Sequence, residues 1–249
     1  MENLYLNKFW RPKIRFNWIL GLILIIALGI PRFIVVMQAY ETGSFYSVFL
    51  IFLTLWFLPF LFLSKSGRKF IGFKKPQKPL WLIYAFVVGV VISFTIYSIG
   101  VWLFGDSVSN WFVYISRSNG ASGNLDESSR LIFFLISAVM SMTFSPVGEE
   151  LFYRGMIHST FQLELGETKA SHVDSMAFAL THLAHFGIVY DNDSWRILLI
   201  PSLLWVTFMF FTSRVFFFFK QKTDSLTGAI LCHSGFNLAM MYCIFYYIL

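Results

Sequence analysis

Three short groups of polar residues interrupt apolar stretches in the second half of this 249-residue sequence. Their members, with the aromatic residue that accompanies them, are Glu149, Glu150, Arg154, Phe178, His182, His233 and Asn237. A carboxylate and an imidazole can activate a water molecule, and a second imidazole with an amide can stabilise an oxyanion. These residue types therefore fit hydrolysis by an activated water, provided that the fold brings the three groups together.

The two adjacent carboxylates are predicted to have different surroundings on a helix. Glu150 and Arg154 are four residues apart and can pair on one helix face. Glu149 is rotated by about 100° from Glu150, because a helix completes a turn in about 3.6 residues. Arg154 can thus neutralise Glu150, so Glu149 is the less compensated carboxylate and the predicted general base.

The same spacing recurs in the other two groups. Phe178 and His182 are four residues apart, and so are His233 and Asn237. Each pair is therefore predicted to lie on one face of its helix.

The composition defines the kind of elements that carry these groups. Hydrophobic residues make up 57% of the chain and charged residues only 13%, and Phe occurs 31 times. Soluble chains average about 25% charged residues, so this chain is predicted to be an integral membrane protein. The formal net charge of +6 comes from short loops between apolar runs. Basic residues in such loops are explained by membrane topology and by contact with anionic lipid headgroups. They disfavour a nucleic-acid partner.

Apolar runs of the length that crosses a bilayer recur along the chain. A spanning helix needs roughly 20 mostly apolar residues. The sequence predicts an all-α, polytopic transmembrane helix bundle of about seven spans, at residues 17–39, 45–63, 80–104, 131–153, 173–190, 196–219 and 227–249.

The basic residues predict the orientation of the bundle. A cytoplasmic N-terminus places most of them on one side: Lys8, Arg11, Lys13, Arg15, Lys65, Arg68, Lys69, Lys74, Lys75, Lys78, Arg154, Lys169, Arg214, Lys220 and Lys222. On or toward the other side remain Arg32, Arg117, Arg130 and Arg196. In this arrangement Glu149, His182 and His233 lie between the cytoplasmic surface and the middle of the bilayer. Because ionisable residues inside spans are costly and usually functional, a shared depth favours a single site.

Two other regions carry no predicted function. The segment 105–130 is polar in its second half and is predicted to be a flexible outer connector. His158 and His172 fall near a predicted membrane edge, where we expect them to be solvated.

The motifs resemble those of one protein family. Glu-Glu-x-x-x-Arg at 149–154, Phe-x-x-x-His at 178–182 and His-x-x-x-Asn at 233–237 are similar, in order, to the three motifs of the CAAX-protease and bacteriocin-processing (CPBP, or Abi) family. The flanking segments 175–183 and 225–230 resemble it as well. The resemblance covers about 130–245, while the first three spans match only as generic membrane helices.

This resemblance implies an intramembrane endopeptidase with assigned residue roles. Glu149 and His182 would orient and deprotonate the attacking water, and His233 and Asn237 would form the oxyanion site. Glu150 with Arg154 would hold the fourth helix in place, supported by Phe178. The chain would divide into N-terminal helices at 1–130 and a catalytic helix core at 131–249.

Metal dependence is left open by the family resemblance, since related enzymes are described both as metalloproteases and as metal-independent glutamate peptidases. No cofactor is favoured, and zinc is the alternative. Its ligands would be Glu149, His182 and His233, with His185 in reserve. A structural zinc–thiolate site is excluded because the chain has two cysteines.

The predicted substrate is a peptide or membrane protein cleaved near the cytoplasmic leaflet, in a bacterial cytoplasmic membrane. A leader-bearing secreted peptide and a prenylated CAAX protein are both compatible, and the oligomeric state carries no sequence signal. The alternatives are a non-proteolytic regulator or bacteriocin-immunity protein that scaffolds a partner such as a sensor kinase, and a proton-coupled transporter. The transporter is disfavoured because no inverted repeat is visible.

Overall fold

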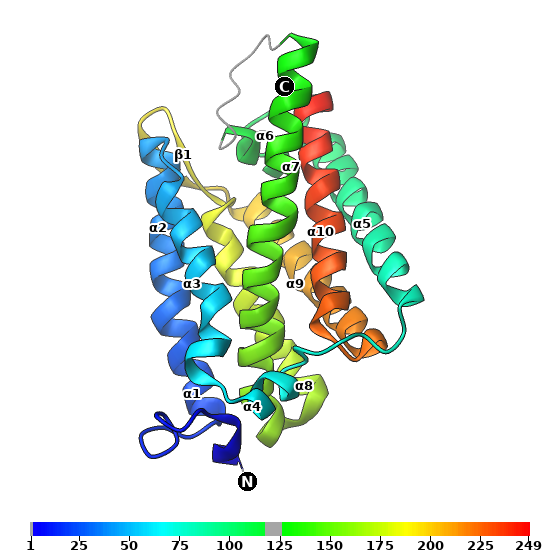
Figure 1. The fold of residues 1–249 in the computed structure, drawn as a ribbon. Coiled ribbons are helices and arrows are strands. Elements are labelled where there is room, and N and C mark those ends of the chain that lie inside the picture. The colour runs from blue at the N-terminus through cyan, green and yellow to red at the C-terminus, as the bar shows by residue number, and fades with distance from the viewer. Residues whose placement is uncertain (1, 118–125) are drawn as a thin grey trace.

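The computed structural model describes residues 2–117 and 126–249, which form a bundle of long helices (Figure 1). The helices are α1 (Trp18–Leu24), α2 (Ile30–Thr42), α3 (Tyr46–Phe62), α4 (Lys65–Phe70), α5 (Leu80–Phe104), α6 (Trp111–Ser116), α7 (Glu127–Glu149), α8 (His158–Thr181), α9 (Leu199–Thr223) and α10 (Leu226–Cys243). Wider, π-helical turns at Ile25–Gly29, Glu150–Ile157 and Ile244–Ile248 join or extend them, and 3₁₀ turns lie at Glu2–Tyr5 and His182–Ala184.

Five helical segments among the described residues are long and apolar enough to cross a membrane: Trp18–Thr42, Leu80–Phe104, Glu127–Ala184, Leu199–Thr223 and Leu226–Ile248. Tyr46–Phe62 is a shorter apolar helix. Helices satisfy their own backbone hydrogen bonds, which is the condition for lying in lipid. The predicted class, a polytopic helical membrane bundle, is therefore confirmed. The total of seven spans and the cytoplasmic N-terminus stay predictions.

The long segment Glu127–Ala184 folds back on itself at Gly166. This residue has φ 75° and ψ 167°, a backbone region that essentially only glycine occupies. The hydroxyls of Tyr153 and Thr181, 28 residues apart, consequently lie 2.9 Å from each other. The reversal returns the second half of α8 alongside the first arm and brings His182 to the level of Glu149.

The ends of the predicted fifth and sixth spans were wrong, because residues 188–197 form a β-hairpin. Strand β1 (Ile188–Asp191) pairs antiparallel with β2 (Ser194–Ile197) in the register Ile188↔Ile197. Asn192 and Asp193 both have positive φ, as a two-residue hairpin loop requires. Asp191 accepts a hydrogen bond from Arg117 at 2.9 Å, which lowers the pKa of its carboxyl.

Helix α6 contradicts the prediction of a flexible connector over part of 105–130. Trp111, Phe112 and Tyr114 are fully buried, and Trp111 donates from Nε1 to the carbonyl of Ile96 at 3.2 Å. Asn110 caps the helix by accepting from the Phe112 amide. The segment therefore closes the bundle at the end opposite the N-terminus (Figure 1).

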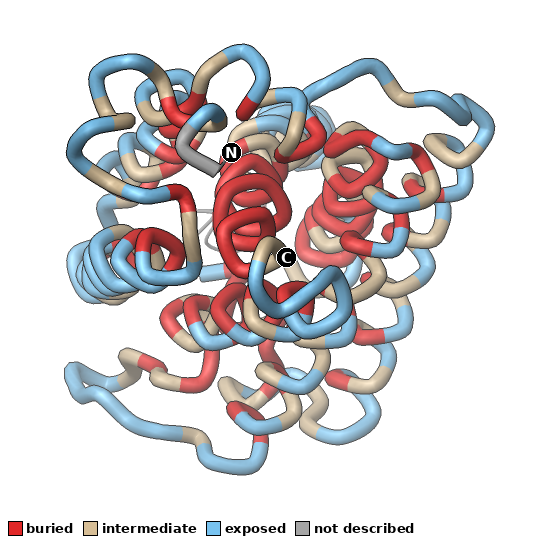
Figure 2. The backbone as a smooth tube through the Cα atoms, turned by 90° about the horizontal axis from the view of Figure 1, so that it is seen from below, coloured by how far each residue is buried: buried red, intermediate tan, exposed pale blue. Residues whose placement is uncertain are grey.

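Helix α10 lies at the centre of the bundle and packs against α5, α7 and α9. Figure 2, which looks along the bundle, shows buried residues gathered on the inner helices, while the outer helices carry many exposed residues. Small residues permit the closest approach. A Cβ on Gly89 would lie 1.9 Å from the carbonyl oxygen of Cys232. The place of α10, and with it His233, thus depends on α5.

Replacing Gly89 with Ala should force α5 and α10 apart. We expect a loss of stability of about 1–3 kcal/mol, since overpacked cores must shift their backbones. Val87→Ala, at a half-exposed position two residues away, is the control and should change little. Thermal unfolding in detergent measures the stability of both variants. Equal unfolding midpoints for the two variants would contradict this packing.

Reporter fusions test the orientation. A reporter placed after Lys78 should be active in the cytoplasm, and one placed in the hairpin after Asp193 should be active outside. The reason is that the loops rich in Lys and Arg lie at the end of the bundle that bears the N-terminus. Cytoplasmic activity at Asp193 would contradict the seven-span topology.

Candidate functional site

A proline in α7 prepares the contact between α7 and α10. Pro146 has no amide hydrogen, so the carbonyl of Met142 loses its helical donor. The hydroxyl of Ser234 donates to that carbonyl at 2.7 Å. One turn away, the Asn237 amide donates from Nδ2 to the carbonyl of Ser141 at 2.8 Å. These two bonds fix the helix that carries His233 and Asn237 against the helix that carries Glu149.

The two glutamates stand where α7 changes into the π-helical segment Glu150–Ile157. All eight residues of that segment are buried. Single π-helical turns inside α-helices often occur at functional sites. Here the junction directs the two adjacent carboxylates to different partners.

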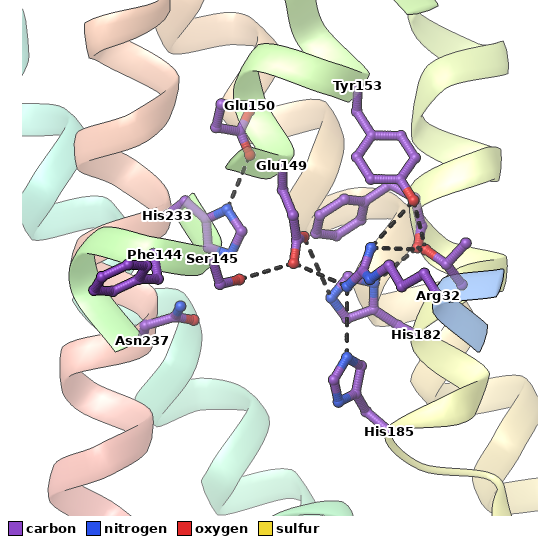
Figure 3. Close-up of polar contacts among 12 residues, drawn as sticks. Arg32, Phe144, Ser145, Glu149, Glu150, Tyr153, His182, His185, His233 and Asn237 are labelled. Atoms are coloured by element: carbon purple, nitrogen blue, oxygen red, sulfur yellow. Dashed lines mark hydrogen bonds and ion pairs between the residues drawn. The ribbon is translucent and has the colours of Figure 1, made fainter. Parts of the chain in front are cut away.

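Glu149 is held through one of its two carboxylate oxygens (Figure 3). Its Oε1 accepts from Arg32 at 2.8 Å and from the hydroxyl of Ser145 at 2.8 Å. Its Oε2 has no hydrogen-bond partner within the described part of the chain and lies 3.8 Å from Nε2 of His182. The Glu149 and Arg32 side chains are 1% and 2% exposed. The site thus presents one fixed, buried carboxylate with a free oxygen facing an imidazole.

Arg32 contacts Glu149 in the candidate site, and the sequence analysis did not predict it there. The basic-residue pattern assigned it to the outer side, but it lies buried in the bundle, where its Nη1 contacts the Tyr153 hydroxyl at 3.1 Å and the Thr181 hydroxyl at 3.3 Å. Its Nη2 lies 3.5 Å from Nε2 of His185. The prediction that Glu149 is the less compensated carboxylate was therefore wrong. The available signal was an ionisable residue inside an apolar span.

His182 has a defined tautomer. Its Nδ1 lies 2.8 Å from the carbonyl oxygen of Phe178, one helical turn earlier. A carbonyl can only accept, so Nδ1 carries the hydrogen and Nε2 of the neutral ring is an acceptor. The ring also packs on Phe178 at 4.1 Å between centroids. Phe178 therefore both orients and supports the imidazole that faces Glu149.

His233 is oriented by the second glutamate. Its Nδ1 lies 2.9 Å from Oε1 of Glu150, and its ring stacks on Phe216 at 4.7 Å. Oε2 of Glu150 lies 3.2 Å from Nε of Arg154, which is the ion pair that the spacing predicts. The sequence analysis did not foresee that Glu150 also meets His233. Glu150 is thus a link between Arg154 and the ring of His233.

Arg154 belongs to a further buried group of charged residues. Its guanidinium packs over Phe178 at 4.2 Å and lies 3.9 Å from Oδ1 of Asp174. Oδ2 of Asp174 lies 2.8 Å from Nδ1 of His158, whose Nε2 lies 3.2 Å from Glu167. The prediction that His158 is solvated was wrong, since it is fully buried. We call Arg154, His158 and Asp174 the charged cluster.

A cavity of about 380 Å³ connects the remaining site residues. Glu149, His182, His185, His233 and Asn237 all line it, and most other lining side chains are aromatic or aliphatic. Glu150 and Arg154 do not line it and lie behind His233 and Phe178. The structure therefore brings the three predicted groups to one place, with one glutamate in the cavity and the other outside it.

The predicted zinc ligands do not fit a metal in this arrangement. Within the described ranges, no three His, Cys, Asp or Glu side chains form a group that could hold an ion. Arg32 places a buried positive charge 2.8 Å from Glu149, the carboxylate that zinc would need. A second cation beside this guanidinium is electrostatically unfavourable.

Removing Arg32 should destabilise the bundle by leaving Glu149 unpaired. For Arg32→Met we expect a loss of about 3–5 kcal/mol, the usual cost of breaking a buried ion pair. The double variant Arg32→Met with Glu149→Gln should recover part of it, because no uncompensated charge is left. Arg196→Met, on the exposed hairpin, is the control.

Thermal unfolding of these three variants and of the wild-type protein in detergent makes the comparison. If the double variant is less stable than Arg32→Met alone, the ion pair does not account for the role of Arg32.

Comparison with known proteins gives a family match to part of the chain. The model of the family described as type II CAAX prenyl endopeptidase Rce1-like matches residues 131–239, which run from α7 into α10. No match was found among curated proteins or solved structures. The family match confirms the resemblance that the three motifs predict. Together with the membrane-spanning helices, it indicates a CAAX-type intramembrane endopeptidase.

Proposed function

Starting from the match of residues 131–239 to Rce1-like CAAX endopeptidases, we propose that this protein hydrolyses a peptide bond with a water molecule activated by Glu149 and His182. The observation that carries the proposal is the separation of 3.8 Å between Oε2 of Glu149 and Nε2 of His182, both bordering the cavity. Two acceptors at this distance can share one water between them. Neither a regulator nor a transporter is favoured by a comparable observation.

In the proposed reaction, the bound water loses a proton to Glu149 while His182 orients it through its second hydrogen. The water oxygen forms a bond to the carbonyl carbon of the substrate, whose oxygen becomes an oxyanion. The protonated Glu149 then delivers its proton to the leaving nitrogen as the C–N bond breaks. The products are a carboxylic acid and an amine, and Glu149 returns to its starting state.

Asn237 and His233 are the proposed donors to the oxyanion. Asn237 uses one amide hydrogen for the carbonyl of Ser141 and keeps the other for the substrate. His233 can donate from Nε2 only when both ring nitrogens carry hydrogen, and the contact of Nδ1 with Glu150 fixes the orientation of the ring. In this division of roles Glu150 acts on the reaction through His233.

Arg32 and Ser145 are proposed to hold Glu149 in the reactive position. Both bond to Oε1, which leaves Oε2 for the water. A carboxylate fixed through one oxygen loses less orientational freedom when the water binds.

The substrate is proposed to be a membrane-associated peptide with apolar residues beside the scissile bond. Phe and Met are the most frequent side chains of the cavity, and they favour apolar groups through burial. A prenylated CAAX peptide and an unmodified leader-type peptide both meet this condition, and a quenched fluorescent peptide assayed with and without the prenyl group separates them.

Glu149→Gln should abolish cleavage of such a peptide, because the general base is lost while the shape of the side chain is kept. We expect a fall of about 10²–10⁴-fold in kcat, measured per amount of folded protein because the loss of the ion pair with Arg32 also lowers stability. Glu164→Gln, on the exposed part of α8, is the matched control and should retain activity. Cleavage by the Glu149→Gln variant at the wild-type rate would contradict the proposed base.

Chelation should leave the activity largely unchanged, because the proposed steps use protein side chains alone. Purified enzyme treated with a strong zinc chelator and then dialysed should cleave at nearly the untreated rate. Loss of activity that added zinc restores would contradict the proposal.

A further inference from the structure

The charged cluster lies behind the two aromatic rings that support the imidazoles of the site. The guanidinium carbon of Arg154 lies 4.2 Å from the ring centroid of Phe178 and 5.3 Å from that of Phe216. Phe178 in turn packs on His182 at 4.1 Å between centroids. Phe216 stacks on His233 at 4.7 Å. Because interiors are closely packed, a shift of Arg154 would move both rings and, with them, both imidazoles.

A second connection runs from Arg154 to His233 through Glu150. Oε2 of Glu150 lies 3.2 Å from Nε of Arg154, and its Oε1 lies 2.9 Å from Nδ1 of His233. The side chains of Arg154 and Glu150 are 0% exposed and that of His233 is 4% exposed. In a low-dielectric interior, contacts between charged groups are strong and hold their members at defined distances. The position of His233, a proposed donor to the oxyanion, therefore depends on Arg154 through two contacts.

Arg154 is itself anchored by the other two members of the charged cluster. Oδ1 of Asp174 lies 3.9 Å from Nε of Arg154. Oδ2 of Asp174 lies 2.8 Å from Nδ1 of His158, and because an ionised carboxylate can only accept, Nδ1 donates. His158 begins the first arm of α8, and Asp174 lies on the second arm, beyond the reversal at Gly166. Asp174 is thus held by one arm and contacts the guanidinium with its other oxygen.

Stability alone is a poor explanation of the charged cluster. Arg154, His158 and Asp174 are fully buried. The desolvation cost of buried charges often exceeds the attraction between them, so apolar side chains of similar volume would stabilise a fold at least as well. What the charges add is a defined geometry. The groups whose geometry depends on Arg154 are the two imidazoles of the site.

We propose that Asp174 and His158 are positioning residues of the peptidase site, which act on the reaction through Arg154. His158 fixes the carboxylate of Asp174, Asp174 fixes the guanidinium, and the guanidinium holds Glu150 and the two supporting rings. The inference rests on the proposed function and adds to it two residues that lie outside the three motifs and do not line the cavity. A misplacement of a reacting group by about 1 Å can cost on the order of 10²-fold in rate.

Asp174→Asn tests the anchor, because asparagine keeps the shape of the side chain and removes its charge. We expect kcat per amount of folded protein to fall by at least about tenfold with an unchanged KM, since the cavity wall is unaltered and only contacts in the transition state are weakened. Asp106→Asn, at an exposed position after α5, is the matched control and should keep the wild-type kcat. An unchanged kcat of folded Asp174→Asn, or an effect confined to KM, would overturn the proposal.

Two substitutions of His158 separate positioning from packing. His158→Asn places an amide hydrogen close to the point from which Nδ1 donates to Asp174, whereas His158→Leu provides no donor. We expect His158→Asn to keep a kcat per folded protein at least about threefold above that of His158→Leu, the effect of one hydrogen bond. His172→Leu, at an exposed position of α8, is the control and should match the wild type. Equal kcat values for the two His158 variants would overturn the role of His158.

A double-mutant cycle in detergent tests the coupling through Arg154 without a substrate. Removing one carboxylate, by Asp174→Asn or by Glu150→Gln, leaves the guanidinium with the other. Removing both leaves a buried guanidinium without the two carboxylates that compensate it, which is strongly destabilising. The fall in the unfolding midpoint of the double variant should therefore exceed the sum of the two single falls. Additive falls would overturn the proposal, because Arg154 would then not join Asp174 to Glu150.

The two kinds of measurement separate this inference from the proposed function. Unfolding midpoints that are coupled as expected, with no cleavage of any peptide by the wild-type protein, would reject the peptidase function. Cleavage by the wild-type protein with an unchanged kcat in both Asp174→Asn and His158→Leu would overturn the positioning role alone.

Discussion

The ion pair between Arg32 and Glu149 is the interaction on which the rest of the site depends. A buried carboxylate in an apolar bundle is stable only when a cation and further hydrogen bonds replace its water. Arg32 supplies the cation at 2.8 Å, and Ser145 supplies a hydrogen bond. The same guanidinium reaches Tyr153 and Thr181, so it joins α2 to both arms of the long folded segment. The position of Glu149 therefore depends on a helix outside the family match.

The two adjacent glutamates have different partners because successive residues of a helix point in different directions. Glu149 turns toward Arg32 and the cavity, and Glu150 turns toward Arg154 and His233. Each carboxylate has its own arginine, so the pair brings no uncompensated negative charge into the bundle. His182 and His233 use Nδ1 for the Phe178 carbonyl and for Glu150, respectively, and keep Nε2 for the cavity. Ionisable groups can face a substrate in an apolar medium when ion pairs on the side away from the cavity compensate their charge.

Contacts within one helix could be predicted from the sequence, and contacts between distant segments could not. The pairing of Glu150 with Arg154 and the stacking of His182 on Phe178 follow from four-residue spacing alone. Arg32 lies 117 residues from Glu149, and nothing local in the chain specifies their contact. His158 is a similar case, because its burial depends on the reversal at Gly166. Membrane class, helix positions and motif order were thus accessible, while the compensating partners required the fold.

The irregular elements of the helices bring buried polar groups to their partners. Pro146 frees a carbonyl that Ser234 then occupies, and the π-helical segment begins at the second of the two carboxylates. Gly166 reverses the chain so that His182 returns to the depth of Glu149. Pro146 and the π-helical segment adjoin Glu149, whereas the reversal at Gly166 acts from a distance by returning His182 to it. Together with the close packing of α5 on α10, these polar contacts align α7, α8 and α10, and the cavity is the space that this alignment leaves beside Glu149 and the histidines.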